Sequence, residues 1–217
     1  MKKLVMVLVV LATCPAAARD GFSIYLGIGG GFFDLSSSSL GSSLEKSGVS
    51  RSDGALLTGT LSDGLSLRLS AAYTIRGYAT VEAGVTGHGW NLGGDDLGGS
   101  GHVSLVAHLH PLEFFLPARD YDASVFLGGG YSILGGGQPN DDNSRGLDGG
   151  TLEFGLAGRY FFSPWFSLGA ELRFYVPFFR RWFVDWGDDV EFDLESHPKA
   201  FFTALLVSFG FHFAPAH

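Results

Sequence analysis

The sequence predicts an all-β protein: an eight-stranded antiparallel up-and-down transmembrane β-barrel that follows a removable export segment. Eight segments alternate apolar with small or polar residues at a period of two, which is the side-chain period of a β-strand. One parity of these segments carries no Asp, Glu, Lys or Arg, whereas the other carries a few charges of both signs. Charged residues make up only 17% of the chain, against about 25% in an ordinary soluble domain.

Composition excludes several other classes. The hydrophobic content of 46% is too high for a disordered chain, and the 33 glycines follow no collagen repeat. The net charge of -8 and the lack of a basic run argue against nucleic acid as a partner. A length of 217 residues suits one domain.

Residues 1–18 have the pattern of a signal peptide. Lys2 and Lys3 precede an apolar stretch that is shorter than the roughly 20 residues needed to span a bilayer, and three alanines end at Ala18. We expect cleavage there, which leaves 19–217 as the barrel domain. The sequence around Cys14 also resembles the site at which bacterial lipoproteins are acylated, and this alternative stays open.

The first four strands are predicted at 22–32, 65–75, 79–86 and 102–110. In the first, Phe, Ile and Leu alternate with Ser, Tyr and Gly. In the second, a set of mostly apolar residues that begins with three leucines alternates with Ser, Arg, Ala and Thr. In the third, Ala and Val alternate with Thr, Glu and Gly. In the fourth, Val, Leu and Ala alternate with a parity that holds three histidines. Each segment has a length suited to crossing a bilayer at a tilt, which takes about 9 to 11 residues.

The last four strands are predicted at 122–133, 152–162, 166–176 and 201–213. In the fifth to seventh, aliphatic and aromatic residues alternate with Gly, Ser and a few charges. The last segment is almost uncharged, but its apolar residues keep the period of two, so we interpret it as a strand and not as a membrane helix.

The predicted connections alternate between short and long. Tight turns are expected at 75–78 and 162–165, and a moderately short connection at 111–120. Long loops are expected at 34–64, 89–100, 135–149 and 178–198, the last of them rich in Asp and Glu, which we interpret as a solvated acidic loop. Short turns at one end and long loops at the other are typical of outer-membrane barrels.

The charged parity is predicted to face the interior. Lysine is nearly absent from 19–217, whereas a soluble barrel would expose many lysines, and a narrow eight-stranded interior suits small residues. Simple hairpin registers place Arg68 diagonal to Glu82, and Arg159 diagonal to Glu171, so that enclosed charges are paired. The predicted interior charge network consists of Arg68, Glu82, Glu153, Arg159, Glu171 and Arg173.

Aromatic residues gather toward both ends of the predicted strands, as in the two interfacial girdles of a membrane barrel. The group at the tight turns is Tyr73, Tyr160, Phe162, Trp165 and Phe166. The group toward the long loops is Phe32, Trp90, Tyr131, Phe174, Phe178, Phe179, Trp182 and Trp186.

With these features the chain resembles the small eight-stranded outer-membrane β-barrels of Gram-negative bacteria, of the OmpA transmembrane domain, OmpX and OmpW type. The resemblance covers 21–213 and includes a closing strand, 208–213, that is similar to the signal read by the barrel-assembly machinery, although here residues 214–217 follow the last aromatic. It implies an outer-membrane location, contact with outer-membrane lipid and lipopolysaccharide, and assembly through the C-terminal strand.

Several barrels of this kind are lipid A enzymes, so a catalytic alternative was considered. His102 and Ser104 stand at i and i+2 on one face, with Glu82 available to orient the histidine. Parity points both side chains inward, away from lipid, and we therefore expect no catalytic residues. His102, His108 and His110 share a face, but so generic a spacing predicts lumen histidines more strongly than a metal site.

The sequence thus favours an outer-membrane barrel with a plugged polar interior and a structural or surface-interaction role, adhesion-like, through its long loops. We expect no cofactor, and the oligomeric state is not predicted. Two alternatives remain: a secreted, soluble lipocalin-like barrel that binds an apolar ligand, and a lipid A-modifying enzyme.

Overall fold

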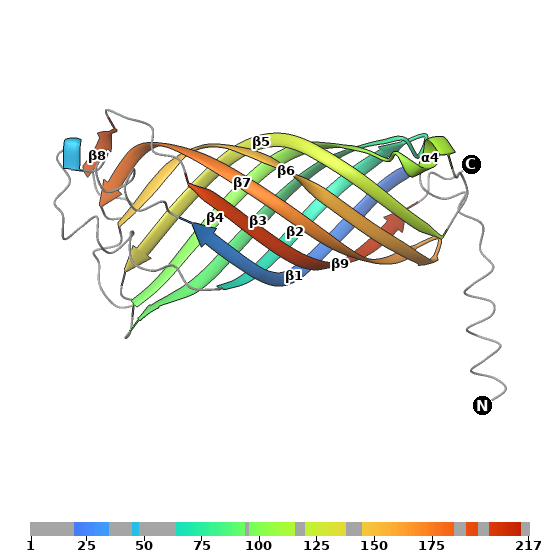
Figure 1. The fold of residues 1–217 in the computed structure, drawn as a ribbon, viewed down its shortest axis with the longest axis horizontal. Helices are drawn as coiled ribbons and strands as arrows, with labels where there is room; N and C mark the ends of the chain where they lie inside the picture. The colour runs from blue at the N-terminus through green and yellow to red at the C-terminus, as the bar shows by residue number, and fades with distance from the viewer. Residues whose placement is uncertain are drawn as a thin grey trace.

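The structure is a computed structural model, and it describes residues 20–34, 45–47, 64–93, 96–115, 120–137, 145–184, 190–194 and 200–213. These residues form a closed antiparallel barrel of tilted strands (Figure 1). Its elements are β1 (Gly21–Asp34), β2 (Gly64–Ile75), β3 (Ala79–Gly93), β4 (Asp96–Leu109), α4 (Leu112–Phe115), β5 (Tyr121–Gly137), β6 (Arg145–Ser163), β7 (Phe166–Val184), β8 (Val190–Asp193) and β9 (Phe201–Phe213).

Each barrel strand pairs antiparallel with its neighbour in the chain, and the circle closes where β9 pairs with both β1 and β7. The short strand β8 pairs with residues 181–184 of β7, so it lies outside the circle of eight. The predicted fold class, an eight-stranded up-and-down antiparallel barrel, is confirmed. Within the described part of the chain no helix is long and apolar enough to cross a membrane.

The two ends of the barrel differ. One end, called the turn end below, holds the β2–β3 turn, α4, the β6–β7 turn, the start of β1 and the end of β9 (Figure 1). The β2–β3 turn is tight because Arg76 and Gly77 both have positive φ, at 50° and 68°. The opposite end, called the loop end, is where the longer connections leave the strands. The predicted signal peptide at 1–18, with Cys14, lies outside the described residues.

Three of the predicted loops are shorter than expected because the strands continue into them. The structure has β3 running to Gly93 and β4 starting at Asp96, where we expected a loop over 89–100. Likewise β5 reaches Gly137, β6 begins at Arg145, and β7 reaches Val184. The extensions of β3, β4, β5 and β6 are rich in glycine, which has no side chain to show a parity but still pairs through its backbone, whereas the extension of β7 over 177–184 contains no glycine. Neither β8 nor α4 was predicted.

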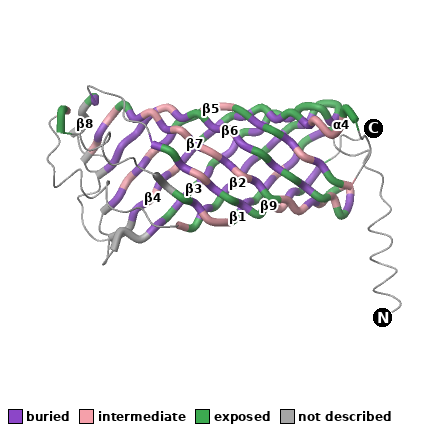
Figure 2. Tube along the Cα trace, in the orientation of Figure 1, coloured by how far each residue is buried: buried purple, intermediate pink, exposed green. Residues whose placement is uncertain are grey.

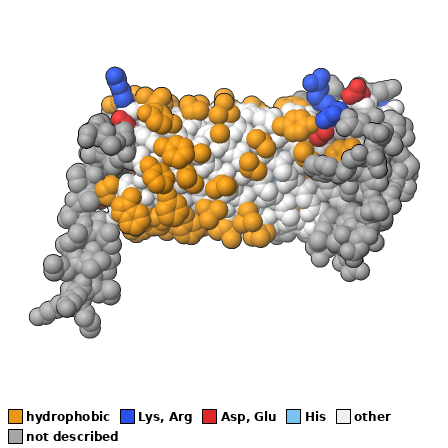
Figure 3. Space-filling view, turned by 180° about the vertical axis from the view of Figure 1, so that it is seen from behind, with side chains coloured by type: hydrophobic (Ala, Val, Ile, Leu, Met, Phe, Trp, Pro, Cys, Tyr) orange, Lys and Arg blue, Asp and Glu red, His pale blue; other side chains and the backbone are white. Residues whose placement is uncertain are grey.

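The outer surface is apolar. Along β2 and β9 exposed and buried residues alternate almost without a break, and the same alternation runs round the barrel (Figure 2). The exposed parity carries large hydrophobic side chains such as Leu69, Leu105 and Leu127, each 59–60% exposed. On the face shown in Figure 3, hydrophobic side chains are spread over the barrel wall, most densely toward the turn end, and the charged side chains that are drawn lie near its two ends. A soluble lipocalin-like barrel would have this parity inside, so that alternative is wrong.

The girdle at the turn end is present: Tyr73, Tyr160, Phe162 and Trp165 are exposed, and Phe166 is half-buried. The girdle at the loop end was partly wrong. Phe32 and Tyr131 are exposed and Phe174 and Phe178 are half-buried, but Trp90, Phe179 and Trp182 are buried inside the barrel. Trp90 stands on the interior parity of β3, and a register irregularity in β7 turns Trp182 inward. Trp186 lies outside the described residues.

The hairpin β6–β7 projects beyond the membrane-spanning region at the loop end. Both strands have 19 residues. At about 3.3 Å per residue and a tilt of about 45°, such a strand rises about 44 Å, whereas the apolar band of an outer-membrane barrel is about 25 Å tall. The end of β7, with β8 paired to it, therefore stands outside the bilayer.

Candidate functional site

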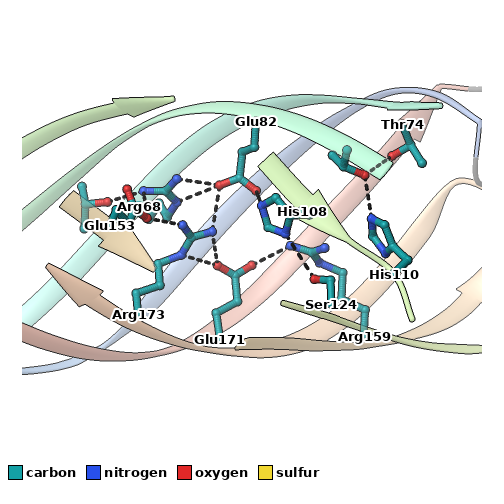
Figure 4. Close-up of polar contacts among 12 residues, drawn as sticks. Arg68, Thr74, Glu82, His108, His110, Ser124, Glu153, Arg159, Glu171 and Arg173 are labelled. Carbon is teal, nitrogen blue, oxygen red and sulfur yellow. Dashed lines mark hydrogen bonds and ion pairs between the residues drawn. The ribbon is translucent and has the colours of Figure 1, made fainter. Parts of the chain in front are cut away.

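The candidate site is the charge network inside the barrel. The structure places all six residues of the predicted network in the interior, each at most 6% exposed. They come from four strands, with Arg68 on β2, Glu82 on β3, Glu153 and Arg159 on β6, and Glu171 and Arg173 on β7 (Figure 4). Each stands on the parity opposite the lipid-facing residues of its strand, so strand alternation alone directs them inward.

Arg68 and Glu82 form the β2–β3 part of the network. The Nε and Nη2 of Arg68 donate to Oε1 of Glu82 at 3.1 and 2.5 Å, and Nη1 donates to Oγ1 of Thr86 at 2.6 Å. Gly84, between Glu82 and Thr86 on β3, makes this possible: a Cβ there would stand 2.5 Å from Arg68 Nη2. Glycine on the interior parity thus leaves the space that the guanidinium fills.

Arg173 is the hub of the network. Its Nη2 donates to Glu82 Oε1 at 2.8 Å, its Nε donates to Glu171 Oε2 at 2.7 Å, and its Nη1 donates to Glu153. The guanidinium also lies 4.5 Å from the ring centroid of Phe126. One fully buried cation therefore joins three carboxylates from three strands (Figure 4).

Arg159 extends the network toward the turn end. Its Nη2 donates to Glu171 Oε1 at 2.9 Å, and its guanidinium stacks 4.1 Å from the ring centroid of Tyr25 on β1. The three arginines balance the three glutamates in formal charge. Buried charges are tolerated only when paired, and this network pairs each charge across the lumen.

Two histidines also contact carboxylates, one inside the network and one outside it. His108 Nε2 lies 3.1 Å from Glu82 Oε2, and His110 Nδ1 donates to Asp122 Oδ2 at 2.7 Å. Asp122 was not among the predicted site residues. It stands on the interior parity of a predicted strand, which is the sequence signal that would have found it.

The residues of the catalytic alternative have other partners. His102 contacts Ser132 through Nδ1 at 2.6 Å and Ser100 through Nε2 at 3.2 Å, and its ring stacks 4.4 Å from that of Tyr175. The Ser104 hydroxyl is buried without a hydrogen-bond partner among the described residues. Glu82 contacts Arg68, Arg173 and His108 instead of His102. The structure therefore does not bring these three residues together as a triad.

The His, Cys, Asp and Glu side chains that the structure describes include no group of three placed to hold a metal ion.

An apolar cluster near the loop end was missed by sequence reasoning. It is built from buried side chains of β3, β5, β6, β7 and β9 together with two residues flanking the last connection: Trp90, Leu134, Leu147, Tyr175, Phe179, Trp182, Leu194, Ala200, Phe202, Ala204 and Leu206. His88 packs against it, with its ring centroid 3.8 Å from that of Phe202. The interior is thus polar through its middle and apolar toward the loop end, so the prediction of a wholly polar plug was incomplete.

Comparison with solved structures identifies the fold. Neisserial surface protein A (NspA) superposes with a TM-score of 0.61 at 12% identity, over 89% of this chain and 98% of that one. The outer membrane protein OprG from Pseudomonas aeruginosa gives 0.52 at 14% identity, over 89% and 97%. Ail, the attachment invasion locus protein of Yersinia pestis, gives 0.51 at 10% identity, over 90% and 100%. The chain has the fold of the small outer-membrane β-barrels.

Searches by sequence do not refine this: no family model and no curated protein matches the chain. At 10–14% identity the small outer-membrane barrels share the fold with this chain. Together with the apolar outer wall, the fold makes this chain an outer-membrane-type β-barrel, as the sequence predicted.

Proposed function

We propose that this protein is a closed outer-membrane barrel that passes no solutes and acts as a rigid scaffold, displaying its loop end for surface interactions of the adhesive kind. The observation that carries the proposal is the filled interior. An eight-stranded barrel is only wide enough to be filled by side chains. Here Arg173 is fully buried at the centre, and Trp182 is 1% exposed toward the loop end.

The second support is the projection of β6, β7 and β8 at the loop end. A hairpin that continues well beyond the apolar band has no role in spanning the bilayer. It gives a stiff base for the connections around it and carries them away from the lipid surface. Ail, which shares this fold, is named as an attachment invasion locus protein. An attachment role for the present chain would use its loop end.

Conductance and attachment measurements test the two halves of this proposal. In planar bilayers the purified protein is expected to leave the membrane current at its baseline, and stable single-channel steps would contradict the closed scaffold.

The attachment test compares two kinds of cells of a non-adherent Gram-negative strain. One displays the protein, and the other displays a variant with 35–63 replaced by a short Gly-Ser linker. The cells with the unmodified protein are expected to bind more host cells or matrix proteins. Equal attachment, with equal folded barrel in both membranes, would overturn the adhesive role.

We further propose that His102 and Ser104 are structural and that the protein does not modify lipid A. The contacts of His102 support this role, because the one with Ser132 ties β4 to its neighbour β5, the one with Ser100 lies within β4, and the imidazole stays inside the lumen. Mass spectra of lipid A from cells expressing the wild type, His102→Ala or Ser104→Ala are expected to be identical. A species present only with the wild type would show that the enzyme alternative is correct.

The closing strand β9 is proposed to carry the signal for the assembly machinery. It pairs with β1 along its whole length and presents Phe211 and Phe213 outward at the turn end. Phe213→Ala is expected to slow the appearance of folded barrel in pulse-labelled cells. Phe201→Ala, which truncates another exposed phenylalanine at the other end of β9, is the matched control. Equal delays for both would contradict the proposal.

A further inference from the structure

The short helix α4, at the turn end, is explained neither by the barrel wall nor by the charge network. It follows β4 and precedes β5, and it presents Phe114 and Phe115 to the surroundings at 57% and 78% exposed (Figure 1 and Figure 2). Phe115 is the most exposed large hydrophobic side chain among the described residues. Two adjacent exposed phenyl rings are unfavourable in water and indicate an apolar contact on this side of the helix.

The helix has two different sides. Its only charged residue, Glu113, is turned toward the β2–β3 turn, because a Cβ added at Gly77 would stand 3.6 Å from Glu113 Oε2. The ring of Phe114 lies on the other side, with its centroid 5.0 Å from that of Tyr78, which is itself 43% exposed. The apolar side of α4 therefore faces away from the barrel rim.

Backbone hydrogen bonds fix α4 in this position. The amide of His110 donates to the carbonyl of Tyr78 at 3.0 Å, and the amide of Glu113 donates to the carbonyl of His110 at 3.2 Å. The amide of Tyr78 in turn donates to the carbonyl of Ile75 across the tight β2–β3 turn, at 3.1 Å. The helix is thus attached to the neighbouring hairpin as well as to its own strands.

The rings of α4 continue the girdle at the turn end. The exposed apolar and aromatic side chains around the helix belong to β2, the β2–β3 turn, β4, α4 and β5: Tyr73, Ile75, Tyr78, Leu109, Phe114, Phe115 and Tyr121. The short turns of an outer-membrane barrel lie on the periplasmic side. This continuous band therefore meets the periplasmic leaflet of the outer membrane.

The chain length between β4 and α4 sets the depth of the helix. Leu109 is the last residue of β4 and stands on its lipid-facing side, three positions before Leu112. At about 3.3 Å per residue these positions cover at most about 10 Å, which is about 7 Å of depth at a tilt of about 45°. The headgroup layer on each side of a bilayer is about 5–8 Å thick. The helix therefore begins within that layer, next to the hydrocarbon.

The charges at this end indicate which kind of lipid suits the helix. Within α4 there is no Lys or Arg, and the exposed Arg76 and Asp20 at the same end of the barrel have opposite signs. Helices that are attracted to anionic lipid are rich in Lys and Arg on their polar face. Aromatic rings, in contrast, favour the interface without a need for lipid charge.

From this placement we propose that α4 is an interfacial anchor whose partner is phospholipid without net charge. Phe114 and Phe115 insert into the headgroup layer of the periplasmic leaflet, beside the barrel wall, and hold the turn end at a fixed depth. The proposal goes beyond the scaffold role and does not depend on it.

A spin label on α4 tests its depth directly. Cys14 is the only cysteine of the chain, so Phe115→Cys in a Cys14→Ser background directs one nitroxide to the helix. The nitroxide ring is apolar and close in size to the phenyl ring, so it preserves the anchor. Collisions with oxygen, which concentrates in lipid, and with a water-soluble nickel chelate are measured for the folded barrel in phosphatidylcholine vesicles.

Two further labelled variants provide the controls. Leu105→Cys places the label on the lipid-facing wall, and Asp193→Cys places it on β8, where the side chain is exposed beyond the bilayer. The label at 115 is expected to collide with nickel severalfold less often than the label at 193, and with oxygen more often. Because the lipid contact needs no charge, the same result is expected after phosphatidylglycerol is added to the vesicles.

Two outcomes of the labelling would overturn the proposal. If the label at 115 meets nickel as often as the label at 193 in phosphatidylcholine vesicles, α4 lies in water. If it does so in these vesicles but is shielded from both reagents in isolated outer membranes, another protein covers α4 and lipid is not its partner. Neither outcome would affect the scaffold role.

Stability in vesicles gives a second test. Since Phe115 is 78% exposed, a loss of stability on its replacement reports the lipid contact and not packing within the protein. Phe115→Ser is expected to lower the urea midpoint in phosphatidylcholine vesicles by the same amount at low and high salt, whereas Phe115→Leu, which stays apolar, is expected to remain close to the wild type. Equal midpoints for Phe115→Ser and the wild type would overturn the proposal.

Discussion

The middle and the loop-end part of the lumen are filled by different physics. In the middle, three arginines and three glutamates form a balanced network in which Arg173 contacts three carboxylates. Toward the loop end, Trp90, Phe179 and Trp182 pack with aliphatic side chains and bring almost no charge. Both parts fill the lumen with side chains. A charge network stabilises only while each charge keeps its partners, whereas an apolar cluster loses stability gradually with each group removed.

The two kinds of filling suit different levels of the barrel. Ion pairs that link β2, β3, β6 and β7 fix which strands face each other across the lumen, since a wrong neighbour leaves a charge unpaired. An apolar cluster tolerates small shifts and suits the level at which strands leave the membrane and connections begin.

The largest effect is expected from Arg173→Met. The change leaves the carboxylates of Glu82, Glu153 and Glu171 with fewer cations in a buried site, and breaking a buried pair costs about 3–5 kcal/mol. Urea titration of the folded protein in phospholipid vesicles, followed by band mobility on unboiled gels, measures this loss.

The control for this variant is Arg181→Met. Arg181 also binds a carboxylate in two places, at 3.0 and 2.8 Å from Asp148, but its side chain is 41% exposed. Arg181 is partly exposed to solvent and binds one carboxylate, whereas Arg173 is fully buried among three, so the loss for Arg181→Met is expected to be clearly smaller. Comparable losses for the two variants would mean that the central network is not a buried one in energetic terms.

A somewhat smaller effect is expected from Trp182→Ala in the apolar cluster. Removing a fully buried indole leaves a cavity and costs about 3 kcal/mol. Trp165→Ala, which truncates a 61% exposed tryptophan at the turn end, is expected to cost less than half as much. The same urea titration measures both, and a larger loss at Trp165 would indicate that lipid contacts outweigh packing in the lumen.

The third test adds a Cβ to an interior glycine, and the expected loss of stability is about 1–3 kcal/mol. At Gly84 an added Cβ would stand 2.5 Å from Arg68 Nη2, so Gly84→Ala crowds the network and is expected to destabilise the barrel. At Gly87, three residues along the same strand and on its outer face, a Cβ meets nothing within 4 Å. Gly87→Ala is expected to be neutral or slightly stabilising. Equal effects would contradict the view that interior glycines make room for charged side chains.

Sequence could predict the eight-stranded fold and the inward position of the charged residues because both follow from a period of two. Arg68, Glu82, Glu153, Arg159, Glu171 and Arg173 all lie in segments whose alternation is unbroken, so parity alone placed them. The pairing of Arg68 with Glu82 was also predictable, since a tight turn fixes the register of β2 against β3.

The apolar cluster could not be predicted in the same way because the parity of β7 is interrupted. Asp148 pairs with Arg181 but Gly149 pairs with Phe179, so Arg180 is an extra residue in the ladder. Phe179 and Trp182 are three positions apart and would face opposite sides of a regular strand, yet both point inward. The sequence predicted a loop over 178–198 and placed both residues in the lipid-facing girdle, which is wrong for both. The partnership of His110 with Asp122 needed the register across α4, and a connection of that length does not fix it.

The smallest effect is expected at Ser104. It tests whether every buried polar group in the filled lumen has a hydrogen-bond partner. Its hydroxyl is buried without a described partner, so wild-type folding incurs a desolvation cost at this atom with no hydrogen bond in return. Ser104→Ala is therefore expected to leave stability unchanged or to raise it by up to about 1 kcal/mol. Ser132→Ala, which removes the 2.6 Å contact with His102 Nδ1 on the adjacent strand, is expected to lower stability by about 1 kcal/mol. A loss at Ser104 as large as that at Ser132 would mean that the Ser104 hydroxyl has a partner in the membrane, such as an ordered water. The middle of the lumen would then be wetter than its close network of charges implies.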